Sequence, residues 1–211
     1  ATAVAGSGKT LTLGTLTLAD GTGLASNYSL ASGTFDINSR QVNIAGSRTY
    51  DGTTTVSGTD LVVTTGVGSE ILTVTGVGSI ASANVGSGKT VTTGTLALAS
   101  GSGNASNYSI GSISVDITQR SVSADFEKIY DATTIVAGSD LKTNGISNTV
   151  LGHSLSLIGA GTMPSTGVAL DKSVSLGTLS LSGSQASNYT LSGGTHTIDV
   201  DPRTTNASGT R

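Results

Sequence analysis

The stretch Lys89–Arg120, KTVTTGTLALASGSGNASNYSIGSISVDITQR, decides how the chain is organised, because it occurs three times. Lys9–Arg40 reads KTLTLGTLTLADGTGLASNYSLASGTFDINSR, and Lys172–Arg203 reads KSVSLGTLSLSGSQASNYTLSGGTHTIDVDPR. The first two copies start 80 residues apart, from Lys9 to Lys89, and the last two start 83 apart, from Lys89 to Lys172. Such a fixed period marks a tandem array of repeats, so the function has to be sought in what an array can do.

A second block keeps the same period. Tyr50-Asp51-Gly52-Thr53-Thr54 returns 80 residues later as Tyr130-Asp131-Ala132-Thr133-Thr134. The chain begins in the middle of a repeat, and we expect it to be a piece of a longer protein. The repeats predict four segments: 1–40 as the C-terminal half of a module, 41–120 and 121–204 as complete modules, and 205–211 as the start of the next.

Strand signals dominate within each repeat. Thr10–Leu13 and Thr15–Leu18 alternate apolar and hydroxyl residues with the period of two that is typical of half-buried strands. Gly14 between them indicates a bulge or kink. Short strands broken by Gly and Asx turns favour a sandwich or barrel. We therefore expect an all-β protein of tandem immunoglobulin-like β-sandwich modules arranged end to end, with an N-terminal half-module. A solenoid β-helix is the alternative.

Composition excludes several classes of protein. Hydrophobic residues make up 36% of the chain and charged residues 11%, whereas disordered chains combine low hydrophobicity with high charge. The net charge is −3 without a basic patch, so we expect no nucleic-acid partner. No apolar run is long enough to cross a bilayer, so we expect no membrane insertion. The chain has 0 Cys, which excludes a disulfide framework and thiol-bound metals.

Four motifs occur in order at matching spacing: Arg48–Thr54, Asn84–Val91, Asn107–Ile110 and Ile117–Arg120. Together they resemble the YDG/MBG repeats, the mostly bacterial Ig-like modules of large secreted bacterial adhesins, similar to filamentous haemagglutinin. The resemblance covers essentially the whole chain. It implies an extracellular or bacterial cell-surface location, a structural role in a fibre or biofilm, and no enzyme activity.

From this resemblance and the array we expect a non-catalytic stalk or spacer of an adhesin or secreted fibre, acting by stiff end-to-end module packing. The alternative is an adhesin module that binds carbohydrate or a matrix polymer. The expected partners are neighbouring copies of the same repeat. Residues 1–40 are expected to pair with another chain or to pack on the module 41–120, because a half-module leaves strand edges unpaired.

Two kinds of motif are the candidate site residues. The tyrosine of each Ser-Asn-Tyr sequence is expected to bury its ring and bond its hydroxyl to nearby backbone, as in a tyrosine corner; an exposed platform for sugar is the alternative. The tyrosine of each Tyr-Asp pair is expected where one module meets the next. The residues concerned are Asn27, Tyr28, Asn107, Tyr108, Asn188, Tyr189, Tyr50, Asp51, Tyr130 and Asp131.

The remaining chemistry is open or excluded. Lys89, Asn107 and Asp116 have the residue types of an intramolecular Lys–Asn isopeptide bond, which needs a buried, protonated carboxyl. Recurring aspartates indicate Asx turns, with calcium at module junctions as the alternative and no other cofactor expected. Gly86–Lys89 looks like part of a P-loop, but Ala83 stands where the first glycine is needed and a strand pattern follows.

Overall fold

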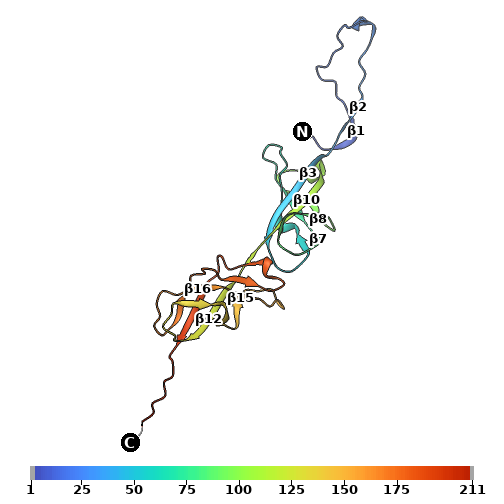
Figure 1. The fold of residues 1–211 in the computed structure, drawn as a ribbon. Helices are drawn as coiled ribbons and strands as arrows, with labels where there is room; N and C mark the ends of the chain where they lie inside the picture. Colours follow the sequence, from blue (N-terminus) through green and yellow to red (C-terminus); the bar gives the residue numbers. More distant parts are fainter. Residues whose placement is uncertain (1–2, 210–211) are drawn as a thin grey trace. The chain divides into compact units, whose positions relative to one another are not determined.

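The computed structural model describes residues 3–209, and it is built from strands and turns (Figure 1). Among the described residues the helical elements are five 3-10 turns of three residues each. The predicted all-β class is therefore confirmed. The chain divides into two compact units: unit 1 is Ala1–Gly46, Thr55–Ile80 and Thr90–Val115, and unit 2 is Ser47–Thr54, Ala81–Lys89 and Asp116–Arg211.

A six-stranded sheet with the order β4-β7-β8-β10-β3-β5 organises unit 1. Two smaller strand pairs, β1 with β2 and β6 with β9, accompany it. Figure 1 shows β3 and β10 beside each other in this sheet. The bounds are β1 (Gly6–Thr10), β2 (Thr34–Ile37), β3 (Arg40–Thr49), β4 (Thr55–Ser57), β5 (Leu61–Val63), β6 (Leu72–Thr75), β7 (Val77–Ile80), β8 (Gly86–Thr92), β9 (Ala97–Ser100) and β10 (Tyr108–Thr118).

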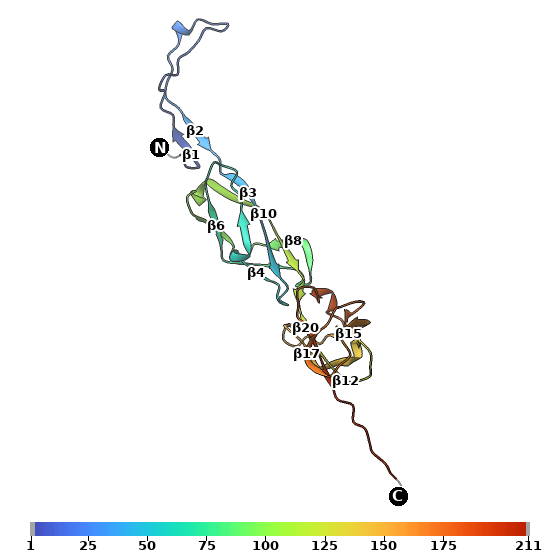
Figure 2. The same ribbon diagram turned by 90° about the vertical axis from the view of Figure 1, so that its left-hand side faces the viewer.

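A four-stranded sheet with the order β14-β12-β20-β17 organises unit 2, and Figure 2 shows β12, β17 and β20 together. Strands β12 and β20 run parallel, from Ala124 opposite His196 to Ile129 opposite Asp201, and both outer strands are antiparallel. The bounds are β11 (Arg120–Ser121), β12 (Ser123–Ile129), β13 (Ile135–Ala137), β14 (Leu141–Ser147), β15 (Ser156–Ile158), β16 (Ala160–Thr162), β17 (Ala169–Ser173), β18 (Ser180–Ser182), β19 (Tyr189–Thr190) and β20 (His196–Asp201).

The strand register repeats between the N-terminal half-module and unit 2. In the pair β1·β2, Gly6 lies opposite Ile37 and Lys9 opposite Phe35. The pair β17·β20 has the same bulge, with Ala169 opposite Val200 and Lys172 opposite Ile198. The other edge of β20 is occupied by β12, whereas β2 pairs only with β1 among the described residues.

The strands predicted at Thr10–Leu13 and Thr15–Leu18 are wrong: of these residues only Thr10 lies in a described strand, as the last residue of β1. In the other copies the part that corresponds to Thr15–Leu18 forms β9, which pairs with β6, and β18, which pairs with β15. In the N-terminal copy no described segment takes the place of β6 or β15. Leu16 and Leu18 are exposed there, because an alternating segment forms a sheet only against a partner.

The buried residues of β12 and of β20 alternate along each strand and contribute to the core of unit 2. Phe126 and Ile198 are 0% exposed, and Ala124 and Val200 are buried beside them. Unit 1 buries alternate residues of β10 in the same way, at Ile113 and Val115. The period-two pattern in the sequence is thus the pattern of burial. The module boundaries stay a prediction, and residues 1–2 and 210–211 of the predicted terminal segments lie outside the described residues.

The two phenylalanines of the chain offer a matched test of this core. Phe126→Ala removes a ring that is 0% exposed, and Phe35→Ala removes one that is 44% exposed. We expect Phe126→Ala to lower the free energy of unfolding by about 3–5 kcal/mol and Phe35→Ala by less than about 1 kcal/mol, because only the first leaves a cavity. Urea denaturation measures both. Equal losses would contradict the placement of the core.

Candidate functional site

Asn188 connects two repeats within unit 2. It ends the 3-10 turn η5 (Ala186–Asn188) and is 2% exposed. Its Oδ1 accepts a hydrogen bond from the backbone N–H of Val85 at 2.9 Å, and its Nδ2 donates to Asn84 Oδ1 at 3.2 Å and to Gln185 Oε1 at 2.9 Å. The amide therefore satisfies a backbone group of the preceding repeat while its own polar atoms are paired, as burial requires.

The same contact occurs in unit 1. Asn107 ends the turn η3 (Ala105–Asn107), and its Oδ1 accepts from the backbone N–H of Ala5 at 2.8 Å while its Nδ2 donates to the Ala3 carbonyl at 3.3 Å. Ala5 and Val85 hold the same position in their repeats. We call this bond, from Ala5 to Asn107 or from Val85 to Asn188, the asparagine contact. The bond occurs in two repeats, with alanine as the donor residue in one and valine in the other. The Ala-Ser-Asn turn is therefore suited to binding the backbone of the preceding repeat.

Tyrosine side chains lie next to the asparagine contact in unit 2. Tyr50 is 2% exposed, with its ring centroid 5.5 Å from Tyr189 at an interplanar angle of 83° and 5.9 Å from His153 at 29°. The Tyr189 hydroxyl is 2.7 Å from His153 Nδ1 and accepts from the backbone N–H of Val150 at 3.0 Å. Edge-on aromatic pairs of this kind stabilise a fold beyond the contribution of the surface area that they bury.

The Tyr50 hydroxyl stays a hydrogen-bond donor in this cluster. It donates to Gln185 Oε1 at 3.3 Å. Burial raises the pKa of Tyr50 above its ordinary value, and the nearby Tyr189 and Asp51 raise it further. The backbone N–H of Tyr50 donates to the Thr118 carbonyl at 2.9 Å, which fixes the ring at the end of β3.

The turn after Tyr50 is held by Asp51 and Arg48. Asp51 Oδ1 accepts from the backbone N–H of Thr53 at 2.9 Å, and Gly52 takes a left-handed φ of 77°. The Arg48 guanidinium pairs with Asp51 and donates to the Thr53 carbonyl at 2.7 Å. Burial tends to raise the pKa of Asp51, but hydrogen bonds from Thr53 and Arg48 outweigh it and hold that pKa below its ordinary value. The Asx turn predicted for Asp51 is formed.

The second copy of this turn keeps its geometry although Ala132 replaces the glycine. Asp131 Oδ1 accepts from the backbone N–H of Thr133 at 2.9 Å, and Ala132 has a φ of 64°. Lys128 takes the place of Arg48, with its Nζ 3.0 Å from Asp131 Oδ1. Tyr130, however, is 36% exposed. The turn is thus built in both copies, and only one of its tyrosines is packed in a described cluster.

The other Ser-Asn-Tyr tyrosines differ in burial. Tyr108 is buried, and its hydroxyl bonds the Glu70 carboxylate, which raises the pKa of Tyr108. Tyr28 is 69% exposed and the preceding Asn27, at the end of η1 (Ala25–Asn27), is also exposed. The structure therefore brings Tyr50, Asn188 and Tyr189 together, places Asn107 and Tyr108 beside residues 3–5, and leaves Asn27, Tyr28, Tyr130 and Asp131 on the surface.

Sequence reasoning missed His153 and Gln185. The other copies have no histidine at the position of His153, and Gln185 stands where the second copy has Asn104. Comparison between repeats finds only shared residues, so a side chain that occurs once gives no such signal. The one available signal was position, since Gln185 directly precedes an Ala-Ser-Asn turn.

Two of the three isopeptide candidates, Asn107 and Asp116, have other contacts. Asn107 makes the asparagine contact, and Asp116 Oδ1 accepts from the backbone N–H of Gly88 at 2.6 Å, just before Lys89. The same bond recurs from Gly8 to Asp36 at 2.7 Å and from Asp171 to Asp199 at 2.8 Å. These aspartates therefore fix the bulged turn that leads to each lysine. The isopeptide bond stays a prediction.

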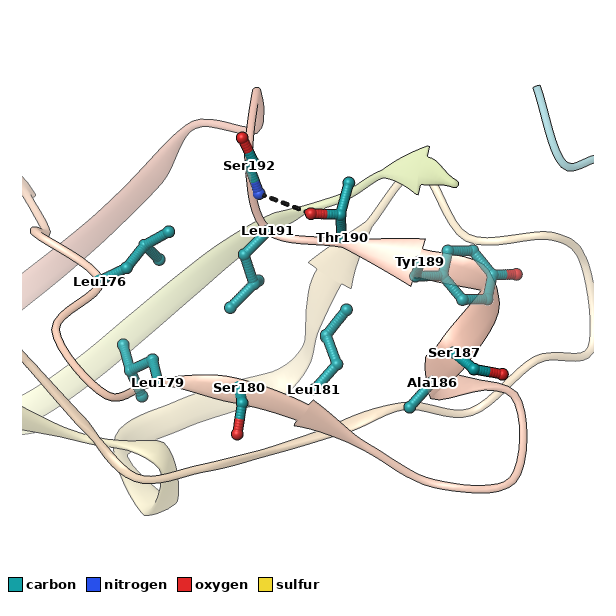
Figure 3. A pocket seen from close by; sticks show the side chains of 10 residues that line it. All are labelled: Leu176, Leu179, Ser180, Leu181, Ala186, Ser187, Tyr189, Thr190, Leu191 and Ser192. Atoms are coloured by element: carbon teal, nitrogen blue, oxygen red, sulfur yellow. Dashed lines mark hydrogen bonds between the residues drawn. The ribbon is translucent and has the colours of Figure 1, made fainter. Parts of the chain in front are cut away.

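Apart from these contacts, the described surface offers little chemistry. A depression of about 420 Å³ is lined by Leu179, Leu181 and Leu191 with serine and threonine hydroxyls, and Figure 3 shows the Tyr189 hydroxyl directed away from the leucines. Within residues 3–209, no group of three His, Cys, Asp or Glu side chains is placed to hold a metal ion. The same residues contain no helix with the length and apolar content needed to cross a membrane.

A family model described as the YDG domain matches residues 37–115 and again residues 116–197. No curated protein and no solved structure matches the chain.

This match corrects the family and function expected from the motifs. It is to the YDG domain in two adjacent copies, and not to a bacterial Ig-like MBG repeat of adhesins. The functions inferred from that resemblance, a stalk or spacer of an adhesin or secreted fibre and a carbohydrate- or matrix-binding adhesin module, have no support in the match and are withdrawn. The motifs carried no information about the role of the whole protein. An extracellular location stays a prediction.

Removing the amide of Asn188 tests the asparagine contact. Asn188→Ala leaves the backbone N–H of Val85 without its acceptor, and we expect a loss of about 1–3 kcal/mol in the free energy of unfolding, the usual cost of a buried unpaired group. Asn27→Ala is the control, because that side chain is exposed. Thermal melting monitored by circular dichroism measures both, and equal melting temperatures would show that the contact contributes nothing.

The Asp131 turn predicts a dependence on acid. Its hydrogen bond from Thr133 and its pairing with Lys128 lower the pKa of Asp131 to about 2, so the folded state binds a proton less readily than the unfolded chain. This contribution to stability is present above the ordinary pKa and is lost as the pH falls toward about 2. Asp131→Asn should therefore be destabilising near neutral pH and close to neutral in effect at pH about 2.

Urea denaturation at both pH values measures this effect, with the exposed Asp201→Asn as the matched control for charge. A destabilisation by Asp131→Asn that is the same at both pH values would contradict the assignment.

Proposed function

Because the chain belongs to the YDG domain family, with two adjacent copies at residues 37–115 and 116–197, we propose that it is a non-enzymatic protein-association module. Its repeats bind further copies of the same repeat. The observation that carries the proposal is the asparagine contact, which joins a repeat to the backbone of the preceding one in both units. A contact that is repeated in this way is reusable, since it depends on a backbone N–H and tolerates alanine or valine at the bonded position.

Association with other chains is proposed at β2. In unit 2 the backbone N–H of Ala124 donates to the Thr195 carbonyl at 3.2 Å, and that of Tyr130 donates to the Asp201 carbonyl at 2.9 Å. Odd-numbered residues of β20 therefore face β12. The register places Thr34 and Asp36 of β2 at the corresponding positions, so their backbone groups face the edge that no described strand covers. An open edge is a template for strand addition.

The chain also contains a segment that suits this edge. Arg40 begins β3 and Arg120 begins β11, which leads into β12. Arg203 stands at the same position of the next repeat, and residues 204–209 are exposed and lie in no strand. One copy of the chain can thus supply a segment of the β3 and β12 type to β2 of another copy.

The immunoglobulin-like character of each repeat belongs to this proposal. Its support is the four-stranded sheet of unit 2, in which β12 and β20 pair in parallel and the outer strands β14 and β17 are antiparallel to them. Immunoglobulin-like sandwiches are used widely as association domains without any shared chemistry.

Nucleic acid is a less suitable partner. The chain has 10 basic and 13 acidic residues. Several of its cations are bonded within the chain: Lys142 lies 2.9 Å from Asp125 and 2.7 Å from Asp199, and Arg120 donates to Asn148. Binding to phosphates depends on free cationic groups.

Sedimentation of the whole chain tests the proposed function. We expect its mass-average mass to rise between roughly 1 and 100 µM, the range in which weak interfaces assemble. Thr34→Pro removes a backbone N–H from the open edge and should weaken self-association by about fivefold, since each lost hydrogen bond costs about 1 kcal/mol. Thr34→Val keeps that N–H and is the matched control. A monomer at every concentration would refute the proposal.

A further inference from the structure

The bond between Asp201 and Pro202 is the one place in the chain where an aspartate precedes a proline. Asp201 is the last residue of β20, and residues 202–209 are exposed and lie in no strand or helix. The bond therefore marks the end of the last strand of unit 2. The other copies have Asn38-Ser39 and Thr118-Gln119 at this position, so the dipeptide occurs in one repeat only.

The chemistry of the dipeptide suits this bond to attack by its own side chain. The carboxyl of an aspartate reaches the carbonyl carbon of the same residue, because the ring that closes has five atoms, and side-chain carboxyls act as nucleophiles in enzymes. Proline has no backbone N–H, so its nitrogen has no strand hydrogen bond to lose when it leaves. The residue before a proline is also held in an extended conformation, as Asp201 is at the end of β20.

The carbonyl of Asp201 is already bonded to a donor. The backbone N–H of Tyr130 donates to it at 2.9 Å. A donor at this oxygen stabilises the negative charge that develops when the carbonyl carbon is attacked, as the donors of an oxyanion hole do. The corresponding bond, from Tyr50 to the Thr118 carbonyl, has the same length of 2.9 Å, so the register of the repeat fixes the donor. In the last copy this donor acts on an Asp-Pro bond.

The carboxyl of Asp201 is exposed, whereas that of Asp199, two residues earlier on β20, is engaged. Asp199 lies 2.7 Å from Lys142 and accepts from the backbone N–H of Asp171 at 2.8 Å. Asp199 also precedes Val200, whose nitrogen carries a hydrogen. The two aspartates of this strand thus differ both in the freedom of the carboxyl and in the bond that follows it.

The cations beside Asp201 are bonded to other groups. Lys128 lies 3.0 Å from Asp131, and Lys172 donates to the Ser165 carbonyl at 2.6 Å. The carboxyl of Asp201 is therefore not held as an ion pair by either of these lysines. The charged residues of the two strands that flank β20, and of the turn after β12, are Glu127, Lys128, Asp131, Asp171 and Lys172.

We propose that Asp201-Pro202 is a self-cleavage site, at which the chain cuts itself once after β20. An Oδ of the protonated Asp201 carboxyl forms a bond to the carbonyl carbon of the same residue, while the bond from that carbon to the Pro202 nitrogen breaks. The carboxyl proton passes to this nitrogen, which leaves as the amine of a new N-terminus. The five-membered anhydride that remains takes up one water and opens to an aspartate with a free α-carboxylate.

The reaction has a defined dependence on acid and a defined product. Because the carboxyl supplies the proton for the leaving nitrogen, the cut is faster in mild acid than at neutral pH. The new α-carboxylate of Asp201 keeps an acceptor for the backbone N–H of Tyr130. Residues 202–209 belong to no strand, so unit 2 keeps its sheet after the cut.

The test follows the mass of the whole chain at neutral pH and at the lowest pH at which circular dichroism shows the native spectrum. In acid we expect two fragments, residues 1–201 and 202–211, whose masses add up to that of the chain plus one water. The same chain in urea at the same acid pH measures the contribution of the fold. The folded chain should be cut at least about tenfold faster, because one preorganised donor changes rates by about 100-fold or more in enzymes.

Two variants at exposed positions test the dipeptide itself. Pro202→Gln introduces the residue that the second copy has at this position and keeps the carboxyl. Asp201→Glu keeps the charge but requires a ring of six atoms. Each should slow the cut by at least about tenfold, because the first restores an ordinary leaving group and the second loses the close approach of the carboxyl. Thr204→Ala, at a neighbouring exposed position, is the control and should be cut at the unchanged rate.

Each outcome decides the proposal. Equal rates in the folded and the urea-unfolded chain would overturn it, since the bond would then break as it does in any unstructured peptide. An unchanged rate in Pro202→Gln, or earlier cleavage at another aspartate, would overturn it as well. Loss of residues 202–211 in acid that is faster in the folded chain and depends on both Asp201 and Pro202 would support it.

Discussion

The backbone N–H of Val85 has to find an acceptor, and Asn188 provides it. Turn backbone that is covered by protein loses its water, and an unpaired group there is costly. The amide of asparagine is short enough to be held by a three-residue 3-10 turn and has both an acceptor and donors, so it can satisfy its neighbour and itself together. The same bond recurs at Asn107 in unit 1.

The tyrosine that follows depends on the same turn. Since adjacent residues leave the turn in different directions, Asn188 faces the preceding repeat while Tyr189 packs within its own repeat and meets Tyr50. Unit 2 thus shows the complete arrangement, with a strand, a Tyr-Asp turn and an asparagine contact in register. Unit 1 repeats the asparagine contact at Asn107.

Much of the fold could be predicted from the period alone. The two bulged pairs β1·β2 and β17·β20 have the same register. Asp36, Asp116 and Asp199 each accept a hydrogen bond from the backbone N–H two residues after the start of the equivalent strand, because residues at the same repeat spacing occupy the same structural position. The prediction of a strand at Thr15–Leu18 was wrong, because alternation indicates a strand but does not supply the partner strand that it needs. His153 and Gln185 could not be found by comparing copies, and their places depend on packing that only the fold brings about. The function attached to the motifs came from a resemblance, and the match to the YDG domain contradicts it.

The parallel pairing of β12 with β20 has a consequence for how the protein is made. Ala124 lies opposite His196, so the two halves of the sheet are separated by most of a repeat. Contacts of such long range are slow to form, because the chain loses conformational entropy in closing the loop before the contacts of the sheet stabilise it. During synthesis β12 leaves the ribosome well before β20, and until β20 emerges one edge of β12 has no partner strand. Each repeat therefore matures only after its last strand has emerged, and the sparing use of large apolar residues on these strands limits the risk of wrong pairing in that interval.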